Sequence, residues 1–279
     1  MRSVNQLDRL RLAVAEWQAK GDRVGLVPTM GNLHAGHLGL VRAIRKHCDR
    51  VVVSIFVNPT QFGPGEDFQT YPRTLEADLE GLKQEGCDLV WLPDVDTMYP
   101  LAESFLVQPP EHLSNTLCGL DRPGHFTGVA SVVLRLFNQV RPDVAIFGEK
   151  DFQQLLIIRQ MVRDLALPIE IQALPTVRES DGLAMSSRNQ YLTAAERATA
   201  PVLHQTLTEL AEKLAAEQPW ENSRQSAWDQ LEAAGFRPQY LEWLSAEDLG
   251  LPQPGRPQRL LVAARLGKAR LIDNVGVVC

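Results

Sequence analysis

Several features that would point to a particular class of protein are missing from this chain of 279 residues. Its four cysteines, Cys48, Cys87, Cys118 and Cys279, lie far apart and form no CxxC pair, which argues against a disulfide framework and against a zinc knuckle. No run of lysine and arginine occurs and the formal net charge is −6, whereas general nucleic-acid binding uses a concentrated basic face. We therefore expect reduced thiols and no nucleic-acid partner.

Long apolar segments are missing too. The longest strongly apolar runs, such as VVVSIFV at 51–57, are far shorter than the roughly 20 residues that span a bilayer. The N-terminus also lacks the apolar core of a signal peptide. These absences predict a cytoplasmic protein that does not interact with membranes.

Two sequence fingerprints of nucleotide binding are absent as well. The chain contains neither GxGxxG nor GxxxxGK followed by serine or threonine. A nicotinamide-dependent dehydrogenase and a P-loop kinase are therefore disfavoured, because both hold their phosphates on such glycine-rich turns.

Residues 1–176 show short apolar strands alternating with amphipathic helices. The five predicted strands lie at 23–28, 51–57, 88–92, 143–147 and 169–177. The five predicted helices lie at 3–20, 37–48, 73–85, 128–140 and 151–165. Such alternation is typical of a doubly wound, Rossmann-like parallel α/β sheet, in which helices cover both faces.

After residue 176 the pattern changes. One long helix over 194–216 and a second over 222–234 are followed by three strand-like segments within 240–278. We therefore expect two domains, a Rossmann-like domain over 1–176 and a smaller α+β domain over 177–279.

Four polar, glycine-containing segments each follow a predicted strand. They are PTMGNLHAGH at 28–37, NPTQFGPGEDF at 58–68, GEKDFQQ at 148–154 and RESDGLAMSSRN at 178–189. Since ligands of open α/β sheets bind beyond the carboxyl ends of the strands, we expect these segments to converge at one edge of the sheet.

The first segment contains two histidines, His34 and His37, where a strand passes into a helix. Gly31 and Gly36 allow the backbone to approach a ligand closely, and the N–H groups and positive dipole end of the following helix favour an anion. Both imidazoles can donate hydrogen bonds to phosphate oxygens. The alternatives are that one histidine caps the helix while the other is merely exposed, or that both bind a metal, although no third ligand stands nearby in the sequence.

Charged and hydroxyl side chains occur in the later segments. Lys150 can meet a phosphate as a point charge, and Asp151 can bond a ribose or simply cap a helix. In MSSRN the guanidinium of Arg188 and the two serines can hold phosphate, although such a sequence also forms routine turns. Gln153 and Gln154 are adjacent on a helix, so only one of them can face a ligand.

Four further positions are candidates for the other substrate or for a metal. Gln61, after the second strand, either reads a small polar substrate or belongs to a structural turn. Asp78, on the next helix, is either a Mg²⁺ ligand or a surface carboxylate. Arg122 and His125 stand in a polar loop that is either a lid for a phosphate or carboxylate or a plain surface loop.

Taken together, these segments resemble one family, the pantothenate synthetases or pantoate–β-alanine ligases. PTMGNLHAGH resembles the family's form of the HxGH signature, which the nucleotidylyltransferase superfamily shares with class I aminoacyl-tRNA synthetases. MSSRN stands where that superfamily has its KMSKS loop. The family order is also followed, over essentially the whole chain, by SIFVNPTQF, YPRTLEADL, RPGHFTGV, FGEKDFQQL and VRESDGLAMSSRN.

The resemblance implies a ligase of pantothenate and coenzyme A biosynthesis. It would condense (R)-pantoate with β-alanine at the expense of ATP, through a pantoyl adenylate, and release pantothenate, AMP and diphosphate. It implies Mg²⁺ besides ATP as a cofactor, and a homodimer formed through the N-terminal domain. The domain over 1–176 would bind nucleotide and pantoate, and the domain over 177–279 would act as a lid.

The resemblance also implies the site residues. The catalytic set would be His37, His34, Lys150 and Arg188. The ATP-binding set would be Met30, Gly31, Asn32, Leu33, His34, Ala35, Gly36, His37, Gly148, Glu149, Lys150, Asp151, Val177, Met185, Ser186, Ser187 and Arg188. Pantoate would contact Gln61 and Gln154, and β-alanine would also face Gln61.

Two assignments are less direct. Asp78 matches a carboxylate that the family links to Mg²⁺, but the neighbouring position, acidic in some members, is Ala77 here. The metal would then be held chiefly by ATP oxygens. Arg122 and His125, from the polar loop, are added to the substrate-binding candidates.

Two other functions remain open from the residues themselves. A different nucleotidylyltransferase would need a cationic pocket for a second phosphate, and the neutral Gln61 in NPTQF argues against one. A non-enzymatic ATP-binding module would have no use for separate polar loops that serve a second and a third ligand.

Overall fold

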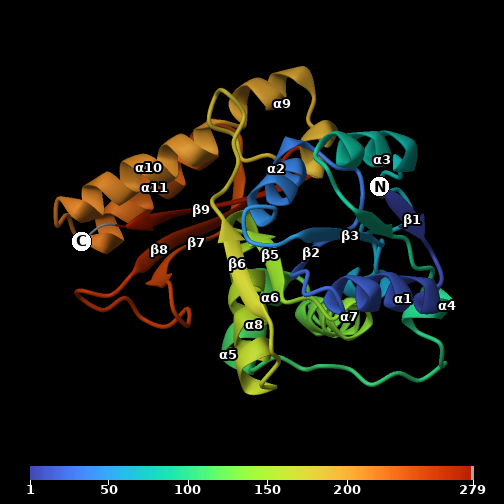
Figure 1. Cartoon of the computed structure of the whole chain (residues 1–279). Helices are drawn as coiled ribbons and strands as arrows, with labels where there is room; N and C mark the ends of the chain where they lie inside the picture. The colour runs from blue at the N-terminus through green and yellow to red at the C-terminus, as the bar shows by residue number, and fades with distance from the viewer. Residues whose placement is uncertain (278–279) are drawn as a thin grey trace. The chain divides into compact units, whose positions relative to one another are not determined.

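The computed structural model describes residues 1–277 and divides them into two compact units (Figure 1). Unit 1 comprises Met1–Glu149 and Gln154–Pro175, and unit 2 comprises Lys150–Gln153 together with the chain from Thr176 onward. Four residues from the middle of the sequence therefore belong to the C-terminal unit. Cys279, one of the four cysteines, lies outside the described residues.

Unit 1 is built on a six-stranded sheet in which every pairing is parallel. Its strands are β1 (Arg2–Val4), β2 (Val24–Thr29), β3 (Arg50–Ile55), β4 (Leu89–Trp91), β5 (Val144–Gly148) and β6 (Glu170–Leu174). The spatial order β1-β4-β3-β2-β5-β6 confirms the doubly wound prediction. From β2 the chain winds to β3 and β4 in one direction, and β5 and β6 lie in the other, so the switch point at which such sheets bind ligands lies between β2 and β5.

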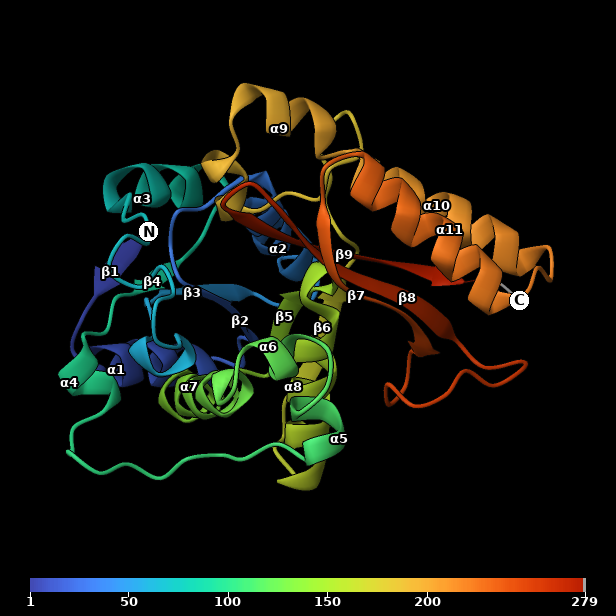
Figure 2. The same cartoon turned by 180° about the vertical axis from the view of Figure 1, so that it is seen from behind.

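Helices cover both faces of this sheet. Their bounds are α1 (Leu7–Gln18), α2 (Ala35–Ile44), α3 (Leu75–Gln84), α4 (Val95–Met98), α5 (Glu111–Ser114), α6 (Cys118–Asp121), α7 (His125–Val140) and α8 (Phe152–Asp164), with 3₁₀ turns η1 (Pro59–Gln61) and η2 (Glu149–Asp151). The two views show α2 and α3 on one face and α1 and α7 on the other (Figures 1 and 2). A central strand such as β3 is therefore apolar on both sides, and Val51, Val52 and Val53 are fully buried.

Unit 2 carries a three-stranded antiparallel sheet in the order β7-β8-β9. Its elements are η3 (Ser187–Tyr191), α9 (Ala194–Thr199), α10 (Val202–Ala215), α11 (Trp220–Ala233), β7 (Arg237–Ser245), β8 (Gln258–Leu266) and β9 (Ala269–Val277). Leu203, Leu207, Leu210 and Leu214 recur at helical spacing along α10 and are buried in the core of this unit.

Two expected elements differ from the structure. The helix predicted over 3–20 begins only at Leu7, because Arg2–Val4 pairs with β4 as an edge strand. The helix predicted over 194–216 is broken into α9 and α10 at Pro201, which has no N–H for the hydrogen bond that would continue the helix.

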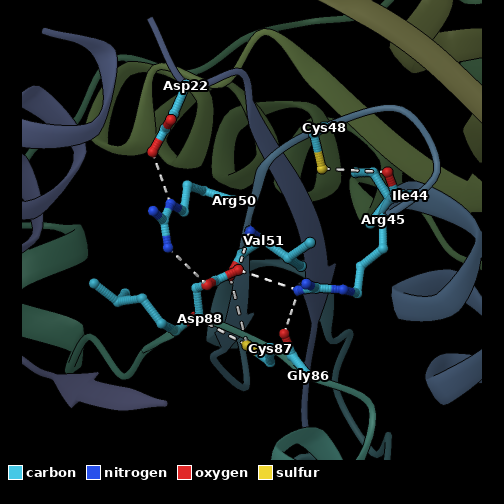
Figure 3. Close-up of polar contacts among 10 residues, drawn as sticks. Asp22, Ile44, Arg45, Cys48, Arg50, Val51, Gly86, Cys87 and Asp88 are labelled. Carbon is cyan, nitrogen blue, oxygen red and sulfur yellow. Dashed lines mark hydrogen bonds and ion pairs between the residues drawn. The ribbon is translucent and has the colours of Figure 1, made fainter. Parts of the chain in front are cut away.

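An ion-pair network stands at the amino-terminal edge of the parallel sheet (Figure 3). Arg50, the first residue of β3, pairs with Asp22 at 2.8 Å and with Asp88 at 3.4 Å, and Arg45 pairs with Asp88 at 3.2 Å. Asp88 also accepts a hydrogen bond from the backbone N–H of Val51 at 2.9 Å. These contacts tie the starts of neighbouring strands together.

Two cysteines lie beside this network, and burial disfavours the thiolate form of each. Burial raises the pKa of the Cys48 thiol to about 11 and that of Cys87 to about 12, and the nucleophilic thiolate is then scarce at neutral pH. In the part of the chain that the structure describes, Cys48, Cys87 and Cys118 form no disulfide.

Among the described residues, none of the helices combines the length and the apolar character needed to cross a lipid bilayer.

Candidate functional site

The loop that follows β2 has a backbone that only certain residues accept. Gly31 has φ of 82° and Asn32 has φ of 51°, both in the left-handed region. A Cβ atom on Gly31 would also come within 3.0 Å of Ile55 and 3.1 Å of the Asp78 carboxylate. Glycine is therefore favoured here by the backbone conformation and by the tight packing around it. The predicted close approach of this backbone to a ligand stays a prediction.

A buried carboxylate holds this loop in place. Asp78, on α3, is 3% exposed. It accepts hydrogen bonds from the backbone N–H groups of Asn32 at 2.9 Å and Leu33 at 2.8 Å, and from the Thr74 hydroxyl at 3.0 Å. The alternative that Asp78 is a surface carboxylate is wrong, because the side chain is buried and each of its oxygens accepts a hydrogen bond from the loop.

The two histidines cap the helix that follows. His34 is the N-cap of α2, where its Nδ1 accepts from the N–H of Gly36 at 3.2 Å. His37 Nδ1 accepts from the backbone N–H of His34 at 3.4 Å, which completes a capping box. The imidazole rings lie 4.1 Å apart between centroids.

This capping sets the tautomer of both rings. An Nδ1 that accepts carries no hydrogen, so in each neutral ring the hydrogen is on Nε2. Nε2 is then the atom through which His34 and His37 can donate to an anion. The structural alternative, a capping histidine, and the functional one are therefore compatible.

The turn after β3 is organised by Asn58, which is 1% exposed. Its side-chain N–H₂ donates to the Gln61 side-chain oxygen at 3.1 Å and to the Gly128 carbonyl at 3.3 Å, and its oxygen accepts from the Tyr99 hydroxyl at 2.8 Å. Gln61 in turn places its Nε2 3.2 Å from the sulfur of Met30. The loops after β2 and β3 thus meet at their side chains, as predicted for the carboxyl edge of the sheet.

Helix α7 reaches the same turn through a glycine. A Cβ atom on Gly128 would lie 2.3 Å from the backbone oxygen of Thr60, well inside any allowed contact. The absence of a side chain at this position therefore permits the close approach of α7 to η1.

Arg122 and His125 engage the Gln61 turn from its backbone side. Arg122 forms a two-pronged ion pair with Glu66, at 2.7 and 2.6 Å, and its Nη1 donates to His125 Nε2 at 2.8 Å. His125 Nδ1 faces the Gln61 carbonyl oxygen at 2.8 Å. Because a carbonyl only accepts and a guanidinium only donates, His125 is the neutral ring with its hydrogen on Nδ1.

Glu66 is held as a carboxylate by this arrangement. Burial opposes its charged form, but the hydrogen bonds and the charge of Arg122 outweigh burial and lower the pKa of Glu66 below 4.5. The predicted loop of Arg122 and His125 is therefore ordered by protein contacts.

The remaining candidates in unit 1 lie at the end of β5 and in the first turn of α8. Gly148 is the last residue of β5, and Glu149 opens the 3₁₀ turn η2. Gln154 is partly buried, whereas its neighbour Gln153, which belongs to unit 2, is buried.

Unit 2 holds the other basic candidates. Lys150 has a side chain that is 20% exposed, with its Nζ 3.7 Å from Asp151. Val177 and Met185 face each other across a short hairpin, in which the N–H of Met185 donates to the carbonyl of Val177 at 3.0 Å. Two serines and an arginine follow directly as Ser186, Ser187 and Arg188. The Ser186 hydroxyl caps η3 by accepting from the N–H of Arg188 at 3.2 Å.

The structure thus assembles the predicted residues in two sets. In unit 1 the loop with His34 and His37 lies beside the Gln61 turn, and in unit 2 the hairpin leads to Arg188. Sequence reasoning missed Asn58, Glu66 and Gly128 as parts of the first set. Only Asn58 carried a sequence signal, because Asn before Pro at a strand end indicates a turn.

Within the described residues, protein side chains alone do not form a metal centre. Over residues 1–277, no group of three or more histidine, cysteine, aspartate or glutamate side chains is arranged to hold an ion. The two oxygens of Asp78 accept three hydrogen bonds between them. Any Mg²⁺ here would need most of its ligands from a bound molecule.

Comparison with known sequences gives a consistent match along the chain. A family model described as pantoate-beta-alanine ligase matches residues 2–276. The pantothenate synthetase of Xylella fastidiosa strain M12 is 56% identical over 277 residues, covering 98% of each chain. That of Xanthomonas campestris pv. campestris strain B100 is 54% identical over 283 residues, covering 99% of each chain.

Solved structures agree with the sequence matches. The pantothenate synthetase of Thermus thermophilus superposes with a TM-score of 0.94 at 46% identity and covers 100% of both chains. The pantoate-beta-alanine ligase of Francisella tularensis, complexed with beta-gamma ATP and β-alanine, has a TM-score of 0.83 at 32% identity and covers 99% of this chain and 97% of that chain.

Proposed function

Because this chain belongs to the pantoate–β-alanine ligase family, we propose that it is an ATP-dependent ligase that joins pantoate to β-alanine and so forms pantothenate. The observation that carries the proposal is the loop over residues 30–37. There Asp78 holds the backbone, and two histidines that cap α2 through Nδ1 keep their hydrogen on Nε2. Such a loop suits the phosphates of ATP, which the Francisella tularensis relative holds in its complex together with β-alanine.

The reaction proceeds in two steps. A carboxylate is a poor acyl donor, so a pantoate oxygen first attacks the α-phosphorus of ATP and the bond to diphosphate breaks. The product is pantoyl adenylate. The amine of β-alanine then attacks the acyl carbon, AMP leaves, and one proton is released as the amide forms. Neither step requires a nucleophile from the protein.

The first step builds negative charge around the α-phosphorus and the departing diphosphate. His34 and His37 can donate to these oxygens from Nε2, and the helix N-terminus adds its dipole. Lys150 and Arg188 are assigned to the same phosphates as the remaining cations. Gly148, Glu149, Asp151, Val177 and Met185 complete the proposed nucleotide contacts together with the loop over residues 30–37 and the two serines at 186 and 187.

Gln61 is the proposed contact for pantoate, and it also faces β-alanine. Its amide is oriented by Asn58, and its carbonyl is held by His125. Arg122 supports that contact through His125, since its guanidinium is paired with Glu66. These contacts favour a supporting role for Arg122 and His125, while Gln154 remains the second proposed pantoate ligand.

Mg²⁺ is proposed to accompany ATP and to take its ligands mainly from phosphate oxygens. When bound, it would neutralise charge on the triphosphate. Asp78 is the only protein carboxylate assigned to Mg²⁺. Its hydrogen bonds to the loop are those of a residue that holds the loop in place.

Pantoate-dependent exchange of labelled diphosphate into ATP tests the proposal, because a ligase that forms an acyl adenylate exchanges without β-alanine. We expect exchange with pantoate and none without it. A different nucleotidylyltransferase would exchange only with a phosphorylated substrate, and an ATP-binding module would not exchange at all. Either result would overturn the proposed reaction.

The domain roles and the assembly state belong to the same proposal. We assign nucleotide and pantoate binding to residues 1–176 and a lid role to residues 177–279. Limited proteolysis should show ATP plus pantoate protecting the C-terminal residues, and unchanged cleavage would contradict the lid. Light scattering should give the mass of a homodimer, and fractionation should place the protein in the cytoplasm.

A further inference from the structure

Two segments in unit 2 carry candidate phosphate ligands, and each is contacted by one of two adjacent residues of β9, Asp273 and Asn274. One segment contains Lys150 and the other is the hairpin that leads to Arg188. Neither β9 residue stands in a predicted binding segment. Their contacts are the basis of a proposal about how the ligands are positioned.

Asp273 holds the hairpin. Its side chain is 2% exposed, and Arg178 donates to its two oxygens at 2.7 and 2.9 Å. The same guanidinium donates to the carbonyl of Gly182 at 3.1 Å, and Arg178 pairs with Ala184 as an antiparallel bridge. A planar guanidinium bound at two oxygens fixes orientation as well as distance, so the hairpin is held to β9 in one geometry.

Asn274 holds the other segment. Its side-chain N–H₂ donates to the backbone carbonyl of Lys150 at 3.0 Å, and its oxygen accepts from Arg259 of β8. The Arg259 guanidinium also lies 4.1 Å from the centre of the Phe152 ring. These contacts explain why residues 150–153 belong to unit 2, although β5 and α8 flank them in the sequence.

The strand geometry makes two neighbours suited to this task. Successive side chains of a strand point to opposite faces of its sheet, and β8 and β9 pair without a register shift at these positions. The backbone N–H of Asn274 also donates to Asp273 at 2.7 Å. Two segments that are remote in the sequence are therefore connected through one rigid point on β9.

We propose that Asp273 and Asn274 are positioning residues that fix Lys150 and the Ser186–Arg188 segment relative to one another. The consequence for catalysis rests on the proposed function, in which both segments bind the phosphates of ATP. Preorganised donors stabilise transition-state charge without rearrangement, and a misplacement of about 1 Å can cost roughly a hundredfold in rate. Neither residue touches substrate in this account.

The first test is Asn274→Asp, which replaces the donor to Lys150 with an oxygen and keeps an acceptor for Arg259. We expect kcat/KM for ATP in the exchange assay to fall by about tenfold to a hundredfold, while KM for β-alanine in the complete reaction stays unchanged. Asn274→Ala, which adds no charge, is the second variant in case the first does not fold. The matched control is Glu242→Gln, which breaks the ion pair with Arg224 in the same sheet and should leave kcat/KM for ATP at the wild-type value.

The second test measures amide hydrogen exchange in the full chain and does not depend on activity. Asn274→Asp should accelerate exchange over residues 150–153, and Arg178→Lys, which keeps the charge but loses the two-pronged contact, should accelerate it over residues 177–185. Core amides of β8 should stay protected in both. Unchanged amide hydrogen exchange in the two segments would overturn the proposed positioning. An Asn274→Asp enzyme whose kcat/KM for ATP matches that of Glu242→Gln would overturn it as well. If the wild-type chain showed no pantoate-dependent exchange, the proposed function would fail while the positioning contacts would still stand or fall on hydrogen exchange.

Discussion

The two edges of the parallel sheet in unit 1 use their polar groups in opposite ways. At the amino edge, Arg45 and Arg50 pair with Asp22 and Asp88, so the charged side chains neutralise one another (Figure 3). At the carboxyl edge, the buried carboxylate of Asp78 accepts from loop N–H groups instead. One edge joins strands by ion pairs, and the other gives a loop a defined shape.

The two edges also differ in what they require of the backbone. Partly exposed ion pairs contribute little free energy and need no special backbone. A buried carboxylate that binds backbone N–H groups, next to left-handed residues such as Gly31 and Asn32, maintains a conformation that the chain would not adopt by itself. This contrast supports the proposed function, in which the substrates bind at the carboxyl edge.

The largest expected effect tests the histidines of the two edges. His37→Ala should lower pantoate-dependent ATP–diphosphate exchange by about a hundredfold or more, since loss of one such donor costs about 3 kcal/mol in the transition state. His47→Ala, an exposed histidine just before β3, is the matched control and should keep full activity. Near-normal exchange by folded His37→Ala would contradict the assigned role.

The second test replaces one carboxylate at each edge by its amide. Asp78→Asn should lower the free energy of unfolding by about 2–3 kcal/mol. The new side-chain N–H₂ would face a backbone N–H of the loop, so that two buried donors would lack an acceptor. Asp88→Asn should cost only about 1 kcal/mol, as expected for partly exposed ion pairs. Urea unfolding measures both values.

The same Asp78→Asn variant separates two roles of this residue. If Asp78 holds the loop, the Mg²⁺ concentration for half-maximal exchange stays unchanged while the maximal rate falls. A strongly raised Mg²⁺ requirement with a normal maximal rate would instead show that Asp78 is mainly a metal ligand. Equal losses in Asp78→Asn and Asp88→Asn would erase the contrast between the edges.

A third test concerns packing at the carboxyl edge. Gly128→Ala places a Cβ atom 2.3 Å from the Thr60 oxygen, so η1 must shift, at a cost of about 1–3 kcal/mol for overpacking. We expect a higher KM for pantoate, because Gln61 moves with this turn. Gly63→Ala is the control, since its Cβ atom would meet nothing closer than 3.8 Å. Its KM for pantoate should match the wild type.

The smallest expected effect is a change in acid stability. Despite its burial, Glu66 has a pKa held below 4.5 by Arg122. A carboxyl with a lowered folded-state pKa stabilises the fold above its unfolded value and loses that contribution as pH falls through the folded value. Glu66→Gln should therefore show a flatter decline in unfolding free energy below pH 4.5 than the wild type. Parallel curves from denaturant titrations at several pH values would show that Arg122 does not stabilise the charged form.

Much of the fold follows from local pattern. The apolar run at 51–57 predicted a central strand, and β3 is buried there; the spacing over 37–48 predicted α2. Helix breaks and short edge strands were harder, as β1 and Pro201 show. A strand of three residues such as β1 exists only because β4 offers it a partner, and no pattern within residues 2–4 contains that information.

For the candidate site, residue types could be read from the sequence but most of their partners could not. The loop with His34 and His37 was identified from glycine and histidine at a strand-to-helix junction. Asp78, which accepts from the N–H of Asn32, is 46 residues away from it in the sequence, and Asn274 is 124 residues away from Lys150. Contacts of this kind depend on which segments the folded chain brings together.

By itself the sequence determined where strands and helices alternate and which polar segments end the strands, because side-chain periodicity acts over a few residues. Only the tertiary structure decided what each polar group does: whether Asp78 faces water or a loop, which tautomer His125 adopts, and that β9 holds Lys150. The physical reason is that a buried donor or acceptor must find a partner wherever the fold places one, and that partner is rarely a neighbour in the sequence.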